Sequence, residues 1–414
     1  MSDNSKETTY IKVVLKPLAP YFFGNERGLL YSDNKTQMGN ANRYFIQSNE
    51  LPNQSALLGA LRYLGIETPS SSYQLSPTDE TRIGGKSFRI DAVDQSFGMI
   101  QKISPLYLMK NEDESLFCPA PFFISAAQTS DKEHHHVYDA LTTDCEERWI
   151  PTYFREKKAD FNQFISLKDG SLINGEEIFS YQTRVVINRK RNYASGAIQY
   201  NDNDKDFIKK QYVVMDKFSF VYYAEVTNDF SEFLKSRRNR TVFLGQGKCP
   251  FAVGISDAGN EGKKLTELAS EGSPIASVVA KHLPGNVQVS GETKSCCCAF
   301  LVSDMFYEET SEQLKNCCQF AMTLKKQYRV FTTNYDEDGK TFQAVSDKAK
   351  GGRFLKANSY YLMQAGSCFL FRDAAQMDSF RYLIEGMKHC HNARKAGFNG
   401  IYYYDPNRST EEKT

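Results

Sequence analysis

The chain has 414 residues, of which 41% are hydrophobic and 13% aromatic, and its formal net charge is +1. This length predicts two or three domains. The near-neutral charge excludes a highly basic coat for nucleic acid, but it allows a local basic groove. Neither a signal peptide nor an apolar run of the roughly 20 residues that cross a bilayer is evident, so we expect a cytoplasmic protein without membrane contact.

Ten cysteines include the adjacent sets Cys296–Cys298 and Cys317–Cys318. Neighbouring residues on a strand face opposite sides, so such runs make poor disulfide frameworks. A Cys-x-x-Cys motif, typical of a zinc ribbon, does not occur. The cysteines therefore predict a reducing compartment and small buried side chains, and no metal site.

The first half of the chain begins with a polar segment, 1–9, that we expect to be disordered. The predicted elements then follow in chain order: a strand at 10–15, a turn-rich stretch at 17–42, a helix at 52–65, a loop at 67–89, and strands at 105–109, 116–117, 184–187 and 218–226. This order of a strand, a helix and two strands favours an α+β sandwich of the ferredoxin-like kind.

The helix at 52–65 carries a leucine stripe and a polar start. Pro52 favours a helix start, and Asn53 or Ser55 can cap the first N–H groups. Such an N-terminus can hold a phosphate, and the fork of Arg62 suits a phosphate oxygen. An ordinary capped core helix is the alternative.

The second half of the chain predicts a similar unit. It has strands at 241–244, 251–255 and 295–304, a helix at 312–328, a hairpin of 360–363 with 368–371, a helix at 377–395 and a strand at 402–404. We therefore predict an α+β fold of two ferredoxin-like domains, at 10–235 and 236–404, with a flexible tail at 405–414.

A basic belt runs from Arg184 to Lys248. It contains thirteen Lys and Arg residues but only seven Asp and Glu residues, with aromatic residues interleaved. Cations for phosphates and rings for bases suit single-stranded RNA, although a solvated hairpin with a charged face is the alternative. Segment 189–217 predicts an extended two-stranded arm. Its Ile198, Tyr200 and Met215 would insert between bases or pack on a neighbouring subunit.

Two glycine-rich segments also suit a polynucleotide backbone. Gly351 and Gly352 precede Arg353 and follow Lys350, and glycine lets a backbone approach phosphate closely. Gly397–Gly400 follows a basic helix end and would offer backbone N–H groups to RNA. Gly397 is also a natural residue to close the preceding helix.

The inventory of catalytic groups is poor. His134–His136 predict an exposed loop, and His389 and His391 lie two apart, a spacing that does not share a helix face. The acidic run 201–206 lacks the glycine and glutamate of a calcium loop. Nucleophile-elbow, Walker and zinc-protease motifs do not occur. We expect neither catalytic residues nor a cofactor.

Several short segments together resemble the RAMP proteins of CRISPR effector complexes, and most closely the large tag-binding subunit of type III-B (Cmr) complexes. These segments are Leu18–Arg27, Pro52–Arg62, Cys118–Pro121, Arg184–Arg189 with Asn188 where an acid is usual, Ala365–Phe371 and Gly397–Gly400. They follow the order expected for the family along nearly the whole chain.

The resemblance implies two ferredoxin-like, RRM-like domains that hold the 5′ tag of the crRNA. It also implies partners: the large polymerase-like subunit, the backbone RAMP subunits and, indirectly, target RNA. Family members of this kind are non-catalytic. The rivals are a RAMP endoribonuclease with His389 as its base, and an assembly protein that binds only other proteins.

On this reading the RNA-binding residues divide into phosphate ligands, backbone donors and an arm that separates tag from spacer. The residues expected to bind RNA are Asn53, Ser55, Arg62, Arg184, Asn188, Arg189, Arg191, Tyr193, Ile198, Tyr200, Met215, Lys248, Lys350, Arg353, Gly397, Phe398, Asn399 and Gly400.

Overall fold

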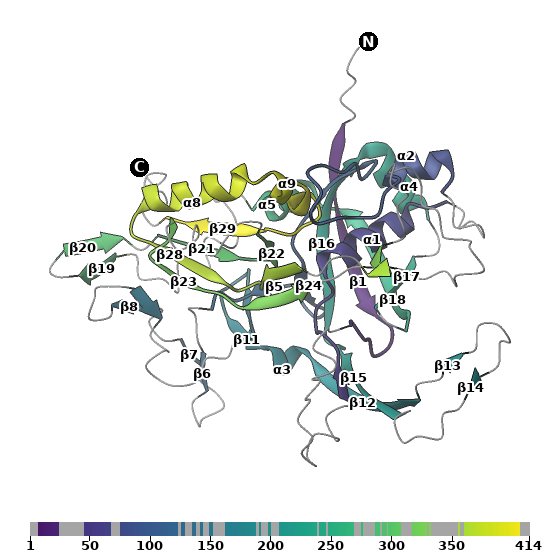
Figure 1. Ribbon diagram of the computed structural model, residues 1–414, viewed down its shortest axis with the longest axis horizontal. Coiled ribbons are helices and arrows are strands. Elements are labelled where there is room, and N and C mark those ends of the chain that lie inside the picture. The colour runs from purple at the N-terminus through teal and green to yellow at the C-terminus, as the bar shows by residue number, and fades with distance from the viewer. Residues whose placement is uncertain are drawn as a thin grey trace, which may run out of the picture.

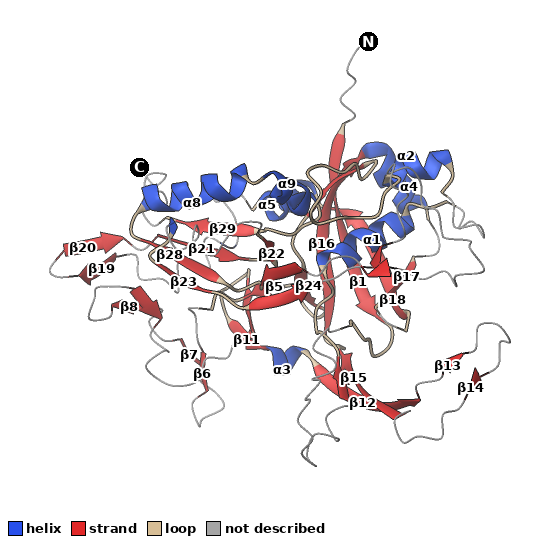
Figure 2. Ribbon diagram, viewed as in Figure 1, coloured by secondary structure: helices blue, strands red, loops and turns tan. Residues whose placement is uncertain are grey.

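The structure is a computed structural model. It describes residues 7–24, 45–67, 75–122, 126–128, 135–137, 141–143, 149–151, 162–187, 190–191, 198–199, 207–237, 240–245, 247–268, 275, 286–289, 292–295, 297–307, 317–328, 331–332, 355–356 and 360–405. Sheets dominate, and most of the helices lie in the upper part of the view in Figures 1 and 2. The predicted α+β class is confirmed.

The largest sheet has nine strands in the described part of the chain. Along the sheet the order is β11 (Leu172–Asn174), β10 (Gln163–Ser166), β5 (Leu116–Pro119), β4 (Tyr107–Lys110), β16 (Phe218–Thr227), β1 (Thr8–Pro17), β18 (Cys249–Asp257) and β17 (Thr241–Leu244), with β3 (Ile100–Ile103) also paired to β16. The central pairs β16–β1 and β1–β18 are antiparallel.

Four adjacent strands of this sheet, β1, β4, β16 and β18, follow one another in the chain with helices between the first and second and between the third and fourth. Helix α1 (Gln54–Leu64) lies between β1 and β4 in sequence, and α4 (Asn228–Ser236) joins β16 to β17 and β18. The spatial order β18-β1-β16-β4 places the fourth strand beside the first and the third beside the second. Strands β17 and β18 thus extend the first sheet beyond the predicted domain boundary at 235/236.

The second half builds a four-stranded sheet. Its order is β23 (Phe320–Met322), β28 (Cys368–Phe371), β21 (Cys297–Leu301) and β29 (Ile401–Tyr404), all antiparallel. In chain order this is again second, third, first, fourth. Helices α8 (Ala374–Gly386) and α9 (Lys388–Lys395) lie between the last two strands in sequence.

Smaller elements complete the fold. A three-stranded sheet joins β22 (Met305–Phe306), β27 (Tyr360–Met363) and β24 (Lys325–Tyr328), and another joins β12 (Ser180–Ile187), β15 (Phe207–Val214) and β2 (Phe45–Gln47). Strand pairs are β13 (Lys190–Arg191) with β14 (Ile198–Gln199), β19 (Asn286–Val289) with β20 (Glu292–Ser295), β25 (Phe331–Thr332) with β26 (Leu355–Lys356), β6 (Ala126–Gln128) with β7 (His135–Val137), and β8 (Leu141–Thr143) with β9 (Trp149–Pro151). Further helices are α2 (Pro77–Ile83), α3 (Gly175–Ile178) and α5 (Gly259–Glu267).

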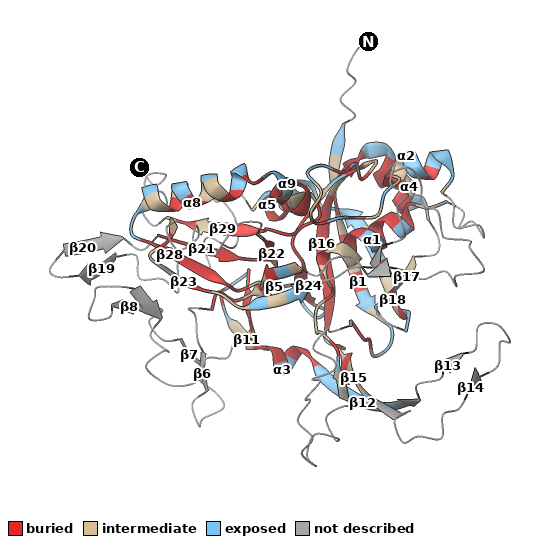
Figure 3. Cartoon of the chain, in the orientation of Figure 1, coloured by how far each residue is buried: buried red, intermediate tan, exposed pale blue. Residues whose placement is uncertain are grey.

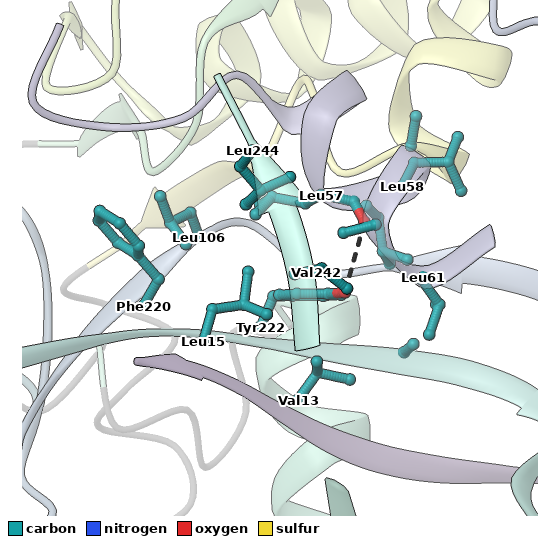
Figure 4. Close-up of a cluster of buried hydrophobic side chains, with 14 of the residues drawn as sticks. Val13, Leu15, Leu57, Leu58, Leu61, Leu106, Phe220, Tyr222, Val242 and Leu244 are labelled. Carbon is teal, nitrogen blue, oxygen red and sulfur yellow. Dashed lines mark hydrogen bonds between the residues drawn. The ribbon is translucent and has the colours of Figure 1, made fainter. Parts of the chain in front are cut away.

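The alternation of β1 explains why helices cover both faces of its sheet. Ile11, Val13 and Leu15 are fully buried in the cluster that includes α1 and α4, whereas Val14 packs with the cluster that includes Leu265 of α5. Figure 4 shows the α1 side, where the Tyr222 hydroxyl donates to the Leu57 carbonyl at 3.3 Å. The predicted leucine stripe of α1 is therefore confirmed as core.

The two halves share cores rather than forming separate ones. Phe306, Tyr328 and Phe398 belong to the same buried cluster as β1 and α1. Val221 of the first sheet likewise packs in one cluster with Phe300 of the second. Because each cluster draws on both halves, we expect the halves to unfold together.

Three predictions for the second half are wrong. Segment 312–328 is not a helix at its end, because Phe320–Met322 and Lys325–Tyr328 are strands. The strands predicted as a hairpin exist, but β27 pairs with β22 and β24 whereas β28 pairs with β21 and β23. The helix predicted at 377–395 is two helices, because Met387 has extended dihedral angles.

Two sequence predictions about polar and thiol groups have clear outcomes. The loop predicted at 67–89 contains α2, which begins after Ser76, whose hydroxyl accepts from the Asp79 N–H at 3.0 Å. Seven of the eight described cysteines are buried, and Cys297 and Cys298 enter different buried clusters because they face opposite sides of β21. The expectation of small buried side chains is confirmed for these seven residues.

We predict that Leu57→Ala lowers the free energy of unfolding by about 2–5 kcal/mol, because it opens a cavity where α1 meets the first sheet. Leu57 is 0% exposed, whereas Leu18, the matched control, is 57% exposed. Leu18→Ala should stay within about 0.5 kcal/mol of the unmodified chain. Urea unfolding at an unchanged m-value measures both; equal effects of the two variants would contradict the assignment of this core.

Candidate nucleic-acid interface

Strands β12 and β15 form an antiparallel ribbon on the side away from helices α8 and α9 (Figure 1). Much of the predicted arm, 189–217, lies outside the described residues, and the described ribbon already begins at Ser180. Residues Ser180–Val185 are all exposed (Figure 3). Strand alternation therefore presents two accessible ribbon faces to solvent.

One ribbon face gathers cations and rings. Arg184 lies opposite Lys210, and Gln182 lies opposite Tyr212, so their side chains share a face with Phe22 beside them. We call Phe22, Gln182, Arg184, Lys210 and Tyr212 the ribbon cluster. These residues come from three segments that are distant in sequence.

The geometry of the ribbon cluster orients its cations. The Arg184 Cζ lies 5.0 Å from the Tyr212 ring centroid, and the Arg184 Nη2 donates to the Gln182 Oε1 at 2.8 Å. The Lys210 Nζ lies 5.2 Å from the centroid of Phe22, whose ring is 5.5 Å from that of Tyr212. A guanidinium held by a ring and an amide keeps further N–H groups for an incoming oxyanion.

The charge of Arg184 is not neutralised locally: no carboxylate pairs with it within the described residues. Charge-assisted bonds to phosphate are about twice as strong as neutral ones, and Arg matches phosphate in a bidentate way. Tyr212 adds a partly exposed ring on which a base can stack. The ribbon cluster therefore has the chemistry to bind a phosphodiester strand.

The base of the ribbon is fixed to the body. The Tyr181 hydroxyl donates to the Glu50 Oε1, which also accepts from the Asn162 Nδ2 at 3.1 Å. Burial, together with this bond to Glu50, raises the pKa of Tyr181 well above its usual range. Val213 exchanges two backbone hydrogen bonds of 2.9 Å with Tyr21. These contacts fix the position of the ribbon cluster relative to the sheets.

A groove of about 330 Å³ lies beside this attachment, between the start of α1, β10 and β24. Its lining is rich in carboxamides, so we call it the amide groove. The carboxamides are those of Asn49, Asn53, Asn162, Gln163, Gln327 and Gln364. Carboxamides offer both donors and acceptors, which suits the edges of unpaired bases.

Charges in the amide groove are nearly balanced. Lys326 pairs with Asp304 at 2.7 Å, and Glu50 is engaged by Tyr181 and Asn162. Lys325 is exposed beside them, and Tyr361 is 66% exposed. The groove thus offers one cation, one ring and many neutral polar groups, a mixture that favours polar bases over a highly charged ligand.

Several residues predicted to bind RNA are instead structural. Arg62 is 9% exposed, and its Nη2 donates to the Gly84 carbonyl at 2.6 Å, so its fork faces the protein interior. Met215, expected to insert between bases, is 3% exposed in the core. Asn53 is the N-cap residue of α1, but its side chain makes no capping bond; it lines the amide groove. Ser55, half-buried in the first turn, does not line that groove.

The Gly397–Gly400 turn does not have the free donors that the prediction required. The Gly397 and Phe398 N–H groups donate to the Arg394 and Ala393 carbonyls at 3.0 Å, which closes α9 in a Schellman motif. The Asn399 and Gly400 N–H groups donate to the Asp304 carbonyl and the Ser303 hydroxyl, at 3.1 and 2.9 Å. Phe398 is 1% exposed and stacks on Phe88.

The remaining predicted residues fall into two groups. Lys248 is exposed, on a turn that packs beside the ribbon cluster, since a Cβ on Gly245 would lie 2.3 Å from the Phe22 carbonyl oxygen. Arg191 and Ile198 lie on β13 and β14, but their side chains are outside the described part. Entirely outside the described residues are Asn188, Arg189, Tyr193, Tyr200, Lys350 and Arg353.

The structure adds residues that sequence reasoning missed. Lys210 and Gln182 join Arg184 only through the register of β12 with β15, which the sequence does not encode locally. Lys325 and Lys326 were missed because they fell in a predicted helix. The alternation Lys325, Gln327 exposed against Tyr328 buried is the strand signal that could have found them.

Metal and membrane features are limited. Within the described residues, no group of three or more His, Cys, Asp and Glu side chains could hold a metal ion. No helix in that part of the chain is long and apolar enough to cross a bilayer.

Comparisons with known proteins give structural likeness only. No family model matches the chain, and no curated protein matches it. A chain of the type III-B Cmr-beta complex bound to cognate target RNA and AMPPnP has 14% identity and a TM-score of 0.46, covering 95% of this chain and 99% of that chain. A chain of Cmr-beta bound to cognate target RNA has 12% identity and a TM-score of 0.45, covering 94% and 96%. An apo-state Cmr-beta chain has 12% identity and a TM-score of 0.24, covering 60% and 97%. Likeness at these TM-scores does not establish a shared fold or function.

We predict that Gly397→Ala lowers the free energy of unfolding by at least about 2 kcal/mol, because φ is +82° and a Cβ would lie 2.5 Å from the Ser104 carbonyl oxygen. Gly386 is the matched control, since a Cβ there meets nothing within 4 Å. Gly386→Ala should leave stability unchanged or raise it by up to about 1 kcal/mol. Chemical unfolding of both variants checks this; a Gly397 variant as stable as the unmodified chain would refute the structural role.

Proposed function

We propose that the chain is a non-catalytic RNA-binding subunit of a type III CRISPR interference complex that holds the 5′ tag of the crRNA. The observation that carries the proposal is the ribbon cluster, where an exposed, unneutralised Arg184 is oriented by Tyr212 beside Lys210. The ordered sequence segments that resemble RAMP proteins support the choice of RNA and of complex. Contacts with the polymerase-like subunit and the backbone RAMP subunits belong to the same proposal.

We further propose that each half is a ferredoxin-like unit. In the first sheet the order β18-β1-β16-β4 corresponds to fourth, first, third and second strands, with α1 and α4 as the two connecting helices. In the second sheet, β29-β21-β28-β23 repeats that order. Two units of this kind support the assignment to RAMP proteins.

In this proposal a strand of RNA binds along the ribbon cluster and enters the amide groove. The Tyr181–Glu50 contact lies between the two, so phosphates held at Arg184 and Lys210 lead to bases placed among carboxamides. Cations position a backbone without reading sequence, whereas amides read base edges. Tag recognition would therefore depend on the groove, and affinity on the ribbon.

We predict that the double variant Arg184→Ala, Lys210→Ala weakens crRNA binding at least tenfold at low salt. Loss of two phosphate contacts should also reduce the slope of log K against log salt by about 1.4, from roughly 0.7 per contact on single strands. Fluorescence anisotropy at four or more salt concentrations measures both quantities.

Lys209→Ala is the matched control for this double variant. Lys209 is an exposed neighbour of Lys210 on the same strand, but it faces the other side of the ribbon, opposite Val185. The Lys209→Ala variant should bind crRNA less than threefold more weakly than the unmodified chain. Equal losses for Lys209 and Lys210 single variants would show non-specific charge attraction instead of a built site, and unchanged affinity of the double variant would refute RNA binding at the ribbon cluster.

We predict that the purified chain leaves repeat RNA intact with or without divalent metal. His389 lies on α9, followed by the buried Cys390 and the exposed His391. Positions 389 and 391 do not share a helix face, so they do not form an acid–base pair. Gel analysis of RNA incubated with the chain tests this; cleavage that disappears in His389→Ala would replace the binding proposal with a nuclease.

A further inference from the structure

Helices α5, α8 and α9 lie on the side of the molecule away from the β12–β15 ribbon (Figure 1). Residues of these helices line a second cavity. It measures about 170 Å³ and lies between β3, the end of α5, helices α8 and α9, and β29. Pockets for drug-sized ligands run from roughly 300 to 1,000 Å³. The helix-side cavity is therefore of a size for a small ligand rather than a polynucleotide.

Three cations and two acids line the helix-side cavity: Lys102, Arg381, Arg394, Glu267 and Glu385. Both acids have partners, because Glu385 pairs with Arg381 at 3.2 Å and Glu267 accepts from the Tyr10 hydroxyl at 3.2 Å. The Arg394 Nη2 donates to the Ile384 carbonyl at 2.8 Å, which leaves its other N–H groups. The balance of the lining is thus positive by one charge.

Lys102 and Thr266 are the unsatisfied groups of this lining. Lys102 is partly buried, and within the described residues its ammonium makes no hydrogen bond or ion pair. Burial lowers the pKa of this ammonium despite the carboxylates of Glu267 and Glu225. Thr266 is 2% exposed, and its Oγ1 is buried without a hydrogen-bond partner. Both residues belong to the lining of the helix-side cavity. Buried polar groups without partners are costly, so a cation and a hydroxyl in one lining favour a ligand that pairs with both.

We propose that the helix-side cavity binds a small phosphate-type oxyanion, either inorganic phosphate or the phosphate of a phosphomonoester. Lys102 and Arg394 would supply the charge, and the Thr266 hydroxyl would donate to an oxygen. An anion is favoured over a cation because three of the five charged side chains in the lining are cations, and one of the two carboxylates, that of Glu385, is already paired with Arg381. Side chains bind it, since the four N–H groups of the adjoining Gly397–Gly400 turn are already used within the protein.

This site is independent of the proposed RNA interface. Its residues come from β3, α5, α8 and α9, whereas the ribbon cluster comes from residue 22 and strands β12 and β15. Anion binding would join the two halves through Lys102 of the first sheet and Arg394 of α9 in the second half. It would therefore also stabilise the folded chain by linkage.

Calorimetric titration of the full chain with sodium phosphate, against sodium chloride at equal ionic strength, tests the proposal. We expect saturable binding to one site, weakened at least tenfold in Lys102→Met and about fivefold or more in Thr266→Val, in line with one lost charge-assisted bond. A parallel titration with adenosine monophosphate distinguishes the two ligand sources: tighter binding than phosphate indicates a phosphomonoester, and weaker binding indicates the free ion.

Lys264→Met is the matched control, because Lys264 is exposed on the same helix as Thr266 and does not line the cavity. It should bind phosphate as the unmodified chain does, as should Arg184→Ala. Thermal unfolding shows that the variants fold; without phosphate, Lys102→Met should have an equal or higher Tm, since it removes a partly buried cation that has no ion pair within the described residues.

Three results would overturn the proposal. The first is no saturable phosphate binding, and the second is an affinity in both Lys102→Met and Thr266→Val that equals that of the unmodified chain. The third is displacement of phosphate by saturating crRNA. The last would mean that the anion site is part of the RNA interface. Failure of RNA binding at the ribbon with intact phosphate binding would refute only the proposed function, so the two proposals fail separately.

Discussion

The turn at Gly397–Gly400 holds the two halves of the molecule together. It closes α9 with two backbone bonds and then bonds the Asp304 carbonyl and the Ser303 hydroxyl of the second half. A side chain at Gly397 would meet the Ser104 carbonyl oxygen at 2.5 Å, and one at Gly400 would meet Pro105 at 2.6 Å. Only a turn without Cβ atoms at these positions lets the second sheet approach the first so closely.

This close approach creates the features that bind ligands. Phe398 enters the core that the two halves share, between Phe88 of the first half and Tyr328 of the second, with ring centroids 5.9 and 5.5 Å away. The amide groove and the helix-side cavity then open on either side of the same seam, and each takes side chains from both halves. A change that loosens the turn would therefore disturb both sites together, although neither needs the turn as a ligand.

Local patterns in the sequence are enough to predict single helices and strands. They fail where the pairing of a strand with distant strands determines the structure. The leucine stripe of α1 and the alternation of β1 are properties of single segments, and both predictions are confirmed. The strands at 360–363 and 368–371 were also located, but they enter different sheets, because non-local partners outweigh a short connecting turn. Propensity likewise favoured a helix at 312–328, whereas pairing of Phe320–Met322 with β28 fixes a strand.

The same distinction explains why one predicted arginine faces solvent and another does not. Arg62 lies four residues after Leu58 and therefore on the buried stripe of α1, a signal that was present in the sequence. Arg184 lies on a ribbon whose two faces are both accessible, so its fork has no interior to enter. A polar helix start with an arginine further along the same helix indicated a phosphate site, but the helical period places Arg62 in the interior.

Net charge conceals the interface for a related reason. Many cations of the described residues are neutralised by nearby acids, as in Lys326–Asp304, Arg82–Asp79 and Lys395–Asp94, at 2.7, 3.1 and 2.8 Å. Such pairs add nothing to a long-range field, so counting cations along the chain identifies the wrong ones. What marks Arg184 is its exposed position against the Tyr212 ring and the Gln182 amide, and what marks Lys102 is its place in the lining of a small cavity. An exposed cation beside aromatic rings can bind a long, flexible anion, because open solvent leaves room for it. A partly buried cation in a small cavity can bind only a small anion, which replaces the water that the cation loses on burial.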